Sequence, residues 1–355
     1  MRPVPVASAD ELTPDWLTDA IGSAGVTGTV TGVECVPIGT GQMSGSYRLR
    51  LTWSEDASPD APRTLVAKLP SPDPQVSAKA GPAYVSETRF YAELAPRLPV
   101  PTARCWYAVV EEKGSTFTLL LEDCAPAEQG DQIEGCTPVE AAAAVRAIGA
   151  LHAATWGNAD IAALPYLAPL GASIAPGLQS VMAALVDAFV EHTEIPADDA
   201  CVLHAFADRT EAWFALRAER FALLHNDFRL DNLLFHPDPH AARPVTVVDW
   251  QSFACGLPAR DVAYFTCTGM EVGVRREIER ELVAVYRAGL EAGGVPAAET
   301  SDVWEDYVVG LFQGPLICVL GSLNSTPTER GNEMFRVMTA RTCAAIRDHD
   351  ALDRL

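Results

Sequence analysis

The sequence has too few basic residues for a protein that binds nucleic acid or an anionic membrane. Its 355 residues include 26 Lys and Arg against 47 Asp and Glu, which gives a formal net charge of −21. A polyanionic partner needs clustered basic side chains, because their charges displace its counterions. We therefore expect no nucleic-acid partner and no membrane partner, and we expect the acidic balance mainly to favour solubility.

Signal, membrane and disulfide patterns are also missing. The first residues, MRPVPVASADELT, contain no basic stretch followed by an apolar run. The longest apolar segment, 308–321, is broken by Gln313, Gly314 and Pro315, so it does not resemble a spanning helix. The nine cysteines are scattered and form no CxxC pair, which is typical of reduced thiols. We expect a cytoplasmic protein in which 308–321 is a buried helix.

The N-terminal third has the alternating pattern of a sheet. Thr13-Pro14 is typical of a helix start, and this helix should end near Gly22. Beyond it, strands are predicted as a hairpin within 30–53, at 64–70, and near 105–110 and 116–121, with a helix at 83–98. Residues 1–123 should therefore form an N-terminal lobe with a short helix, a five-stranded sheet and one further helix.

The composition changes after residue 123. The segment 124–136 is polar and contains glycine and proline, which predicts a connector. Thr137-Pro138-x-Glu140 is a capping box that predicts a helix to about Ala154. Further helical patterns cover 175–193, 198–219, 274–292, 301–321 and 327–348, and two short apolar runs within 222–250 predict a small hairpin. Residues 137–355 should form a mainly helical C-terminal lobe.

The residues with the clearest chemical meaning lie in HNDFRLDNLLF, 225–235. Phosphoryl transfer needs a carboxylate that orients the attacking hydroxyl and accepts its proton, and it needs oxygen ligands that hold Mg²⁺. Asp227 suits the first role, and Asn232 and Asp249 suit the second. Taken alone, Asp227, Asp231 and Asn232 are as typical of a turn between two elements.

Three upstream features favour the phosphoryl-transfer interpretation. A glycine-rich hairpin tip offers backbone N–H groups and hydroxyls to phosphate oxygens through Gly39, Gly41, Ser44, Gly45 and Ser46. Lys68, in an apolar strand, can contact the α- and β-phosphates, and Glu87 on the following helix can pair with it. Each feature alone is more often a plain turn or a solvated charge. Their joint order along the chain is what carries the prediction.

Together these motifs resemble the aminoglycoside-phosphotransferase-like superfamily of small-molecule kinases. The phrases LVAKLP, SETRFYAEL and LLLED are similar to its branch of ecdysteroid-kinase-like proteins, and the resemblance covers roughly 30–350. It implies an α+β, protein-kinase-like bilobal fold with an antiparallel-sheet N-lobe and a mainly helical C-lobe. It also implies ATP and Mg²⁺ as cofactors and a small-molecule acceptor.

The resemblance assigns roles residue by residue. It implies Asp227 as the catalytic base, Asn232 and Asp249 as Mg²⁺ ligands, and Lys68 with Glu87 as the phosphate-binding pair. The connector positions implied for adenine contact are Leu121, Glu122, Asp123 and Cys124. His225 and Asp261 match positions that brace the catalytic loop. Two features depart from the family pattern: Asn226 stands where glycine is common, and the glycine spacing differs from G-x-G-x-x-G. No GxxxxGK[ST] sequence occurs, which excludes a P-loop.

Several questions stay open in the sequence. His152 suits buried packing better than substrate contact, and the acidic residues of the connector suit a solvated loop better than a cation-binding rim. A cationic acceptor could meet Glu271, Glu305 and Asp306, and a bulky apolar alcohol could meet Trp304, Tyr307 and Phe312. Core packing explains these aromatic residues at least as often. We expect a phosphotransferase acting as a monomer or homodimer. The alternatives are a pseudokinase, which binds nucleotide without transfer, and a helical scaffold, which binds none.

Overall fold

The computed structural model describes residues 3–39, 43–111, 114–167, 175–324 and 327–355. The chain forms two units, each with its own core. Unit 1 comprises Met1–Leu98, Thr102–Ala125 and Val248–Ser252; unit 2 comprises Pro99–Pro101, Pro126–Val247 and Phe253–Leu355. The short segment Val248–Ser252 therefore belongs to the first unit although it follows a strand of the second.

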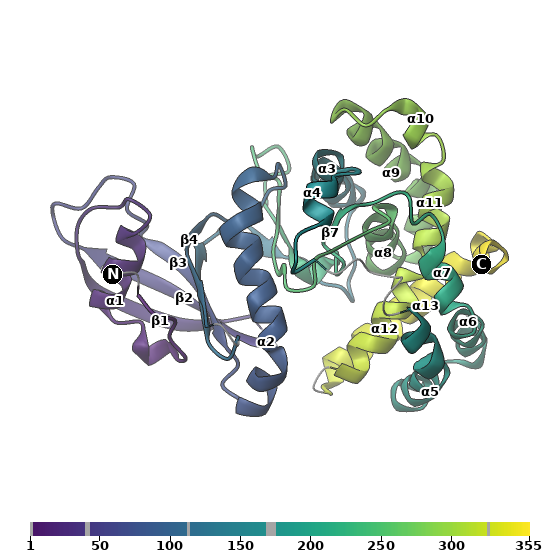
Figure 1. Ribbon diagram of the computed structural model, residues 1–355, viewed down its shortest axis with the longest axis horizontal. Coiled ribbons are helices and arrows are strands. Elements are labelled where there is room, and N and C mark those ends of the chain that lie inside the picture. Colours follow the sequence, from purple (N-terminus) through teal and green to yellow (C-terminus); the bar gives the residue numbers. More distant parts are fainter. Residues whose placement is uncertain (1–2, 40–42, 112–113, 168–174, 325–326) are drawn as a thin grey trace. The chain divides into compact units, whose positions relative to one another are not determined.

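Unit 1 is an antiparallel sheet between two helices (Figure 1). The five strands, in spatial order, are β1 (Val30–Ile38), β2 (Ser44–Trp53), β3 (Thr64–Pro70), β5 (Phe117–Glu122) and β4 (Cys105–Val110). Leu65, Ala67 and Leu69 join the core formed with α1 (Pro14–Gly22). Side chains alternate along a strand, so Lys68 points to the opposite face, toward α2 (Pro74–Arg89). The predicted five-stranded sheet is confirmed.

Helix α2 begins nine residues before the predicted start at 83. Asp73 caps it by accepting a hydrogen bond from the backbone N–H of Gln75, and Pro74 takes the first helical position. The side chains of its first two turns are polar or small, so this part of the helix shows no regular spacing of apolar residues. After Arg89 the chain continues as a π-helical turn, η2 (Phe90–Leu94), and a 3₁₀ turn, η3 (Ala95–Arg97), instead of the α-helix predicted to 98.

Unit 2 is mainly helical. Its helices are α3 (Pro138–Thr155), α4 (Ala159–Ala162), α5 (Ala175–Thr193), α6 (Ala197–Ala207), α7 (Thr210–Ala215), α8 (Ala259–Gly269), α9 (Val272–Ala292), α10 (Ala297–Thr300), α11 (Val303–Gly310), α12 (Gln313–Asn324) and α13 (Glu329–Asp348). The capping box of Thr137 and Glu140 starts α3 as predicted. The helix predicted over 301–321 is instead two helices that break at Leu311 and Phe312.

Short strands carry the loops of unit 2. The predicted hairpin is confirmed as β8 (Leu233–Phe235) paired with β9 (Val245–Val247). The segment 124–136 is more than a linker, because it contains β6 (Glu128–Gln129), which pairs with β8. A further pair joins β7 (Ala222–Leu224) to β10 (Ala254–Gly256).

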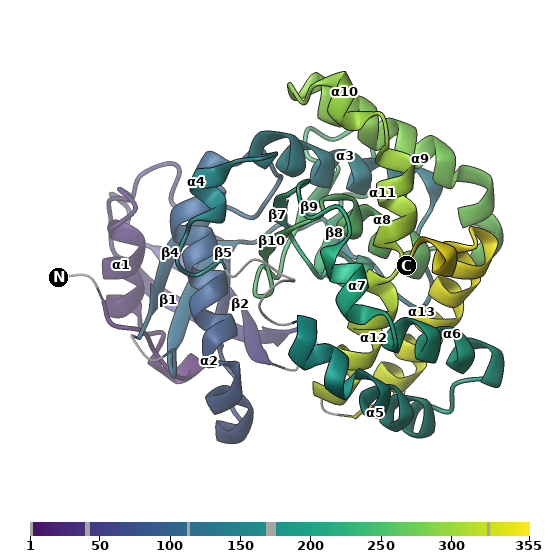
Figure 2. The same ribbon diagram turned by 45° about the vertical axis from the view of Figure 1, so that its right-hand side comes forward.

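Helix α8 was not predicted and is the centre of unit 2. All eleven of its residues are buried. Figure 2 shows it enclosed by α3, α9, α11, α12 and α13, each of which contacts it. Its polar residues Arg260, Asp261, Thr266 and Thr268 are buried as well, so they are covered by the surrounding helices instead of facing solvent. The stretch Val303–Leu323 is apolar and long enough to span a membrane, but 78% of its most apolar window is buried in the protein, as in a core helix.

Helix α8 also buries an unpaired cation. Arg260 is 2% exposed, and its guanidinium lies 3.9 Å from the ring centre of Trp213, whereas Nε and Nη1 have no hydrogen-bond partner in the described part of the chain. Burial lowers the pKa of Arg260. Burying a charge without a charged partner is costly, and an apolar side chain of similar length avoids this cost. Arg260→Met should therefore raise the free energy of unfolding by about 1–4 kcal/mol in denaturant titrations.

The control for this prediction is Arg336→Met at an exposed position of α13, which should change the free energy of unfolding by less than about 0.5 kcal/mol. A clear loss of stability in Arg260→Met, with no change in the control, would show that the guanidinium is needed for packing.

Candidate functional site

In unit 1 the site is built around Lys68. Its Nζ lies 2.8 Å from Glu87 Oε1, 2.7 Å from Glu87 Oε2 and 2.9 Å from Asp249 Oδ1. The strand β3 presents the lysine to α2, and the segment after β9 brings Asp249 to the same ammonium. The structure thus brings together three residues that are far apart in the sequence.

In this cluster two carboxylates, those of Glu87 and Asp249, surround the single ammonium of Lys68. Burial lowers the pKa of Lys68, but Asp249 and Glu87 outweigh that effect and hold the pKa above its ordinary value. Burial raises the pKa of Glu87, and Asp249 adds to this while Lys68 opposes it. Lys68 therefore stays charged at neutral pH, with two carboxylates competing for it.

Asp249 is held in an unusual backbone conformation. Its φ is +65°, in the left-handed region that residues other than glycine rarely adopt. The next residue, Trp250, stacks on Phe90 of the π-helical turn η2, with ring centres 3.8 Å apart and planes within 6°. The backbone N–H of Trp250 also donates to Glu87. Such strain persists only where the surroundings fix it, and it is concentrated at functional sites.

The glycine-rich tip lies between β1 and β2. Gly39 has φ +71° and open space around the position of a Cβ, whereas Gly41 lies outside the described residues. A Cβ on Gly45 would come within 2.9 Å of the Tyr47 ring. Ser46 pairs directly with Lys68 across β2 and β3, so the two side chains share one face of the sheet. Ser44 begins β2 and is buried.

The predicted adenine-contact positions follow the end of β5. Leu121 is buried in the strand, and Glu122 accepts a hydrogen bond from the Arg104 N–H. The Asp123 carboxylate is 2.9 Å from Arg48 Nε, and the Cys124 thiol is 3.7 Å from the Glu122 carbonyl. Asp123 is thus paired with a cation and is not a free carboxylate.

In unit 2 the site is built around Asp227. Its Oδ1 accepts a hydrogen bond from the Tyr264 hydroxyl at 3.0 Å. Its Oδ2 accepts from Asn232 Nδ2 at 3.0 Å and from Arg229 Nε at 3.4 Å. The side chain keeps 21% of its surface exposed. Asp227 is therefore oriented by three donors while it remains open to a substrate.

The orientation of the Asn232 amide follows from its partners. Nδ2 donates to the Asp227 carbonyl at 2.8 Å as well as to the carboxylate, and both of these atoms are acceptors only. The NH₂ group must therefore face Asp227. The amide oxygen Oδ1 makes no hydrogen bond to any described residue. It is left as a donor atom of the kind that Mg²⁺ takes.

A buried carboxylate on α8 supports this loop from behind. Asp261 Oδ2 accepts from the backbone N–H of His225 at 2.7 Å, and Oδ1 accepts from that of Asn226 at 2.9 Å. His152 is fully buried and lies with Nε2 3.3 Å from Asp261 and Nδ1 2.8 Å from the Tyr286 hydroxyl. His152 thus contributes to the support of Asp261, through its position in the core.

Sequence reasoning missed three residues of the loop's surroundings. Tyr264 lies on the unpredicted helix α8, and burial together with Asp227 raises its pKa well above the usual range, so it stays a hydrogen-bond donor. Arg229 reaches Asp231 Oδ2 with Nη1 at 2.6 Å. Gln132, in the segment taken as a linker, is fully buried and accepts from the Leu230 N–H at 2.8 Å. The residue pattern gave a signal only for Arg229, which lies inside the catalytic motif.

The residues predicted to meet an acceptor are occupied with other partners. Asp306 is buried, with Oδ2 2.6 Å from Arg220 Nη1, and Glu305 pairs with Arg354 at 3.3 Å. Glu271 caps α9 by accepting from the backbone N–H groups of its first turn. The aromatic candidates Trp304, Tyr307 and Phe312 pack against other side chains, and the last two are fully buried. Tyr307 and Phe312 are therefore core residues, and Asp306 is a buried ion-pair partner.

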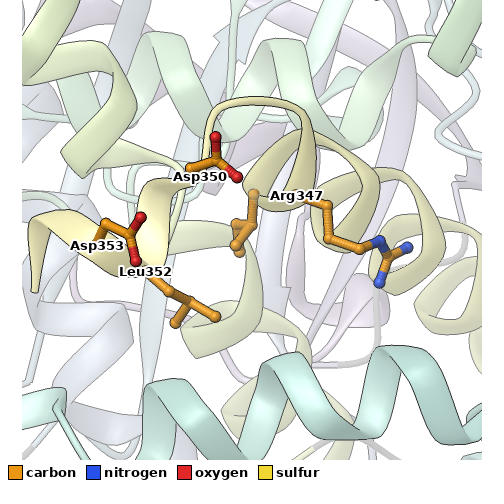
Figure 3. A pocket seen from close by; sticks show the side chains of 5 residues that line it. Arg347, Asp350, Leu352 and Asp353 are labelled. Carbon is orange, nitrogen blue, oxygen red and sulfur yellow. The ribbon is translucent and has the colours of Figure 1, made fainter.

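A pocket of about 290 Å³ lies at the C-terminal end of α13 (Figure 3). Its lining is formed by Ile346, Arg347, Asp350, Leu352 and Asp353. None of the predicted site residues lines this pocket. It is therefore not part of the candidate site, and its residues can serve as control positions for mutation.

Comparison with known proteins agrees with this chemistry. The model of the phosphotransferase enzyme family matches residues 50–300. Among solved structures, the choline kinase of Cryptosporidium parvum Iowa II aligns with a TM-score of 0.58 and 11% identity, over 90% of this chain and 91% of that one. The GDP complex of aminoglycoside 2'-phosphotransferase-IIIa aligns with a TM-score of 0.50 and 12% identity, over 88% and 93%. At these identities the structures show a shared fold.

Curated relatives match over short segments. Mouse acyl-CoA dehydrogenase family member 10 is 45% identical over 60 residues, 16% of this chain and 5% of that protein. Chicken acyl-CoA dehydrogenase family member 11 is 37% identical over 79 residues, 21% of this chain and 9% of that protein. The chain thus spans less than a tenth of the length of these relatives.

Proposed function

Since the chain belongs to the phosphotransferase enzyme family of small-molecule kinases and has the protein-kinase-like fold, we propose that it transfers the γ-phosphate of ATP to a hydroxyl group of a small molecule. The observation that carries the proposal is the partly exposed Asp227 carboxylate, oriented by Tyr264, Asn232 and Arg229. This is the arrangement that a base for an incoming hydroxyl requires.

The proposed step assigns each atom a destination. The acceptor oxygen attacks the γ-phosphorus, the bond between that phosphorus and the β,γ-bridging oxygen breaks, and the hydroxyl proton passes to Asp227. ADP leaves with the bridging oxygen. Arg229 Nη2 makes no hydrogen bond to the described residues, so it is available to a phosphoryl oxygen. Burial lowers the pKa of Arg229, but Asp227 and Asp231 outweigh it and keep the side chain charged.

The donor atoms of the chain fit ATP and Mg²⁺. Lys68 supplies a fixed ammonium for the α- and β-phosphates, and Glu87 would keep it in place. Asn232 Oδ1 and the Asp249 carboxylate are hard oxygen donors, as Mg²⁺ prefers. When bound, the metal would neutralise charge on the phosphates.

Nucleotide binding is the cheapest test of this proposal. ATP with Mg²⁺ should raise the melting temperature, because a ligand that binds only the folded state stabilises it by about 2.7 kcal/mol at a hundredfold excess over its Kd. The shift should be smaller with ATP and EDTA. Equal melting temperatures with and without nucleotide would favour the scaffold alternative.

The acceptor is best found with a chemically broad panel. Its members should include choline and an aminoglycoside, which the names of the aligned structures contain. An acyl-CoA that carries a free hydroxyl group is added because the curated relatives are named as acyl-CoA dehydrogenase family members. A steroid alcohol completes the set. ATP binding without any phosphorylated product would favour the pseudokinase alternative.

A further inference from the structure

Gln313 is a polar residue in an otherwise apolar interior. It is the first residue of α12, it interrupts the apolar segment 308–321, and it is 1% exposed. Its Nε2 donates to the Asn226 carbonyl oxygen at 3.1 Å and to Asn226 Oδ1 at 3.0 Å. The amide therefore connects the start of α12 to the residue that precedes Asp227.

The orientation of this amide is fixed by the backbone. A carbonyl oxygen only accepts hydrogen bonds, so the NH₂ group must face Asn226. The other end of the amide, Oε1, is buried and has no hydrogen-bond partner among the described residues. A buried acceptor without a partner is unfavourable, and an apolar residue at this position would avoid that cost. We therefore expect the role of Gln313 to depend on the two hydrogen bonds that its NH₂ group donates.

Asn226 is the residue that needs such support. Its φ is +69°, in the left-handed region that asparagine tolerates and glycine adopts freely. Its N–H is held by Asp261 Oδ1 at 2.9 Å, on one side of the residue. Gln313 donates hydrogen bonds to the carbonyl oxygen and to the side-chain oxygen of Asn226. The direction of the chain into Asp227 is thus set by two helices, α8 and α12.

We propose that Gln313 is a positioning residue for catalysis, which locks the left-handed Asn226 and so fixes the direction of the Asp227 carboxylate. This role rests on the proposed function of Asp227 as the base. It also gives a reason why a chain with asparagine, where glycine is common, retains a fixed loop.

The test uses Gln313→Leu and the closer isostere Gln313→Met in the full-length chain. ATP hydrolysis by water, measured as ADP release with Mg²⁺, needs no identified acceptor. We expect kcat per folded molecule to fall about tenfold, with the KM for ATP within twofold, because one loop-fixing hydrogen-bond donor is lost. The melting temperature should fall little, since the unpartnered Oε1 is removed at the same time.

Two further variants separate positioning from a general structural effect. Asn226→Gly in the Gln313→Leu background should restore kcat to within threefold of wild type, because glycine needs no lock at positive φ. The control Gln179→Leu removes two side-chain hydrogen bonds elsewhere in unit 2, one donated to the Ala207 carbonyl and one accepted from the Glu211 N–H, and its kcat should stay within twofold. A Gln313→Leu enzyme with wild-type kcat, or no recovery with Asn226→Gly, would overturn the proposal.

Hydrogen exchange gives a readout that does not depend on turnover. The peptide over 222–231 should exchange faster in Gln313→Leu than in wild type, and at the wild-type rate in Gln179→Leu. If the wild-type protein neither transfers nor hydrolyses phosphate, the proposed function fails. The exchange data then test by themselves whether Gln313 fixes the conformation of Asn226. Unchanged exchange in Gln313→Leu would contradict the lock.

Discussion

Replacing Asp227 with Asn is expected to lower kcat by about 10²–10⁴-fold, the usual contribution of a general base. The amide is nearly the size of the carboxylate but cannot accept the hydroxyl proton. In wild type the carboxylate meets three donors, from Tyr264, Asn232 and Arg229. An amide also lacks the negative charge that the Arg229 guanidinium faces, which should cost about 1 kcal/mol of stability. The KM for ATP should change little.

The comparison needs a second aspartate that is remote from the chemistry. Asp353, in the pocket at the end of α13, provides it. Asp353→Asn should keep wild-type kcat. Steady-state kinetics with the acceptor from the product panel measures both variants. An Asp227→Asn enzyme within threefold of wild type would remove Asp227 from the base role.

Replacing Lys68 with Met should damage both nucleotide use and the fold. Loss of a charged contact to the phosphates should lower kcat/KM for ATP by about 10²–10³-fold. The change also leaves Glu87, 2% exposed, without its cation. Removing one partner of a buried ion pair costs about 3–5 kcal/mol, and the partial exposure of Asp249 places the expected loss near the lower limit.

Lys79→Met is the matched control, because Lys79 is exposed on the same helix as Glu87. It should leave the melting temperature and kcat/KM close to wild type. Lys68→Arg keeps the charge and should recover most of the stability but less of the activity, since a guanidinium presents its charge differently from an ammonium. Wild-type kcat/KM in a folded Lys68→Met protein would contradict the phosphate role of Lys68.

Much of the fold was predictable because its elements have one buried face. Strand β3 alternates between buried and less buried residues, and the capping box of α3 is a local signal that the structure confirms. Helix α8 was missed although all of its residues are buried, because it is only eleven residues long and its polar residues, such as Arg260 and Asp261, face the interior and not solvent. The start of α2 was missed for another reason, since its first turns have almost no apolar face.

In the candidate site, too, some residues were predictable from the sequence and others were not. Asp227 and Asn232 lie within one short motif, so their spacing alone indicates shared chemistry. Tyr264 is 37 residues away and reaches Asp227 only through the packing of α8. Gln132 lies in a polar segment that has the composition of a linker, yet its side chain is fully buried against the loop. Residues whose role depends on tertiary contacts leave no local pattern, and this explains why both were missed.

The most direct test of the account is mass spectrometry of the acceptor panel after incubation with ATP, Mg²⁺ and the wild-type protein, with Asp227→Asn in parallel. The account predicts one acceptor that gains a single phosphoryl group, with one ADP formed per product, and no such product from the variant. ATP binding without any phosphorylated acceptor in wild type, or equal product from both proteins, would contradict it.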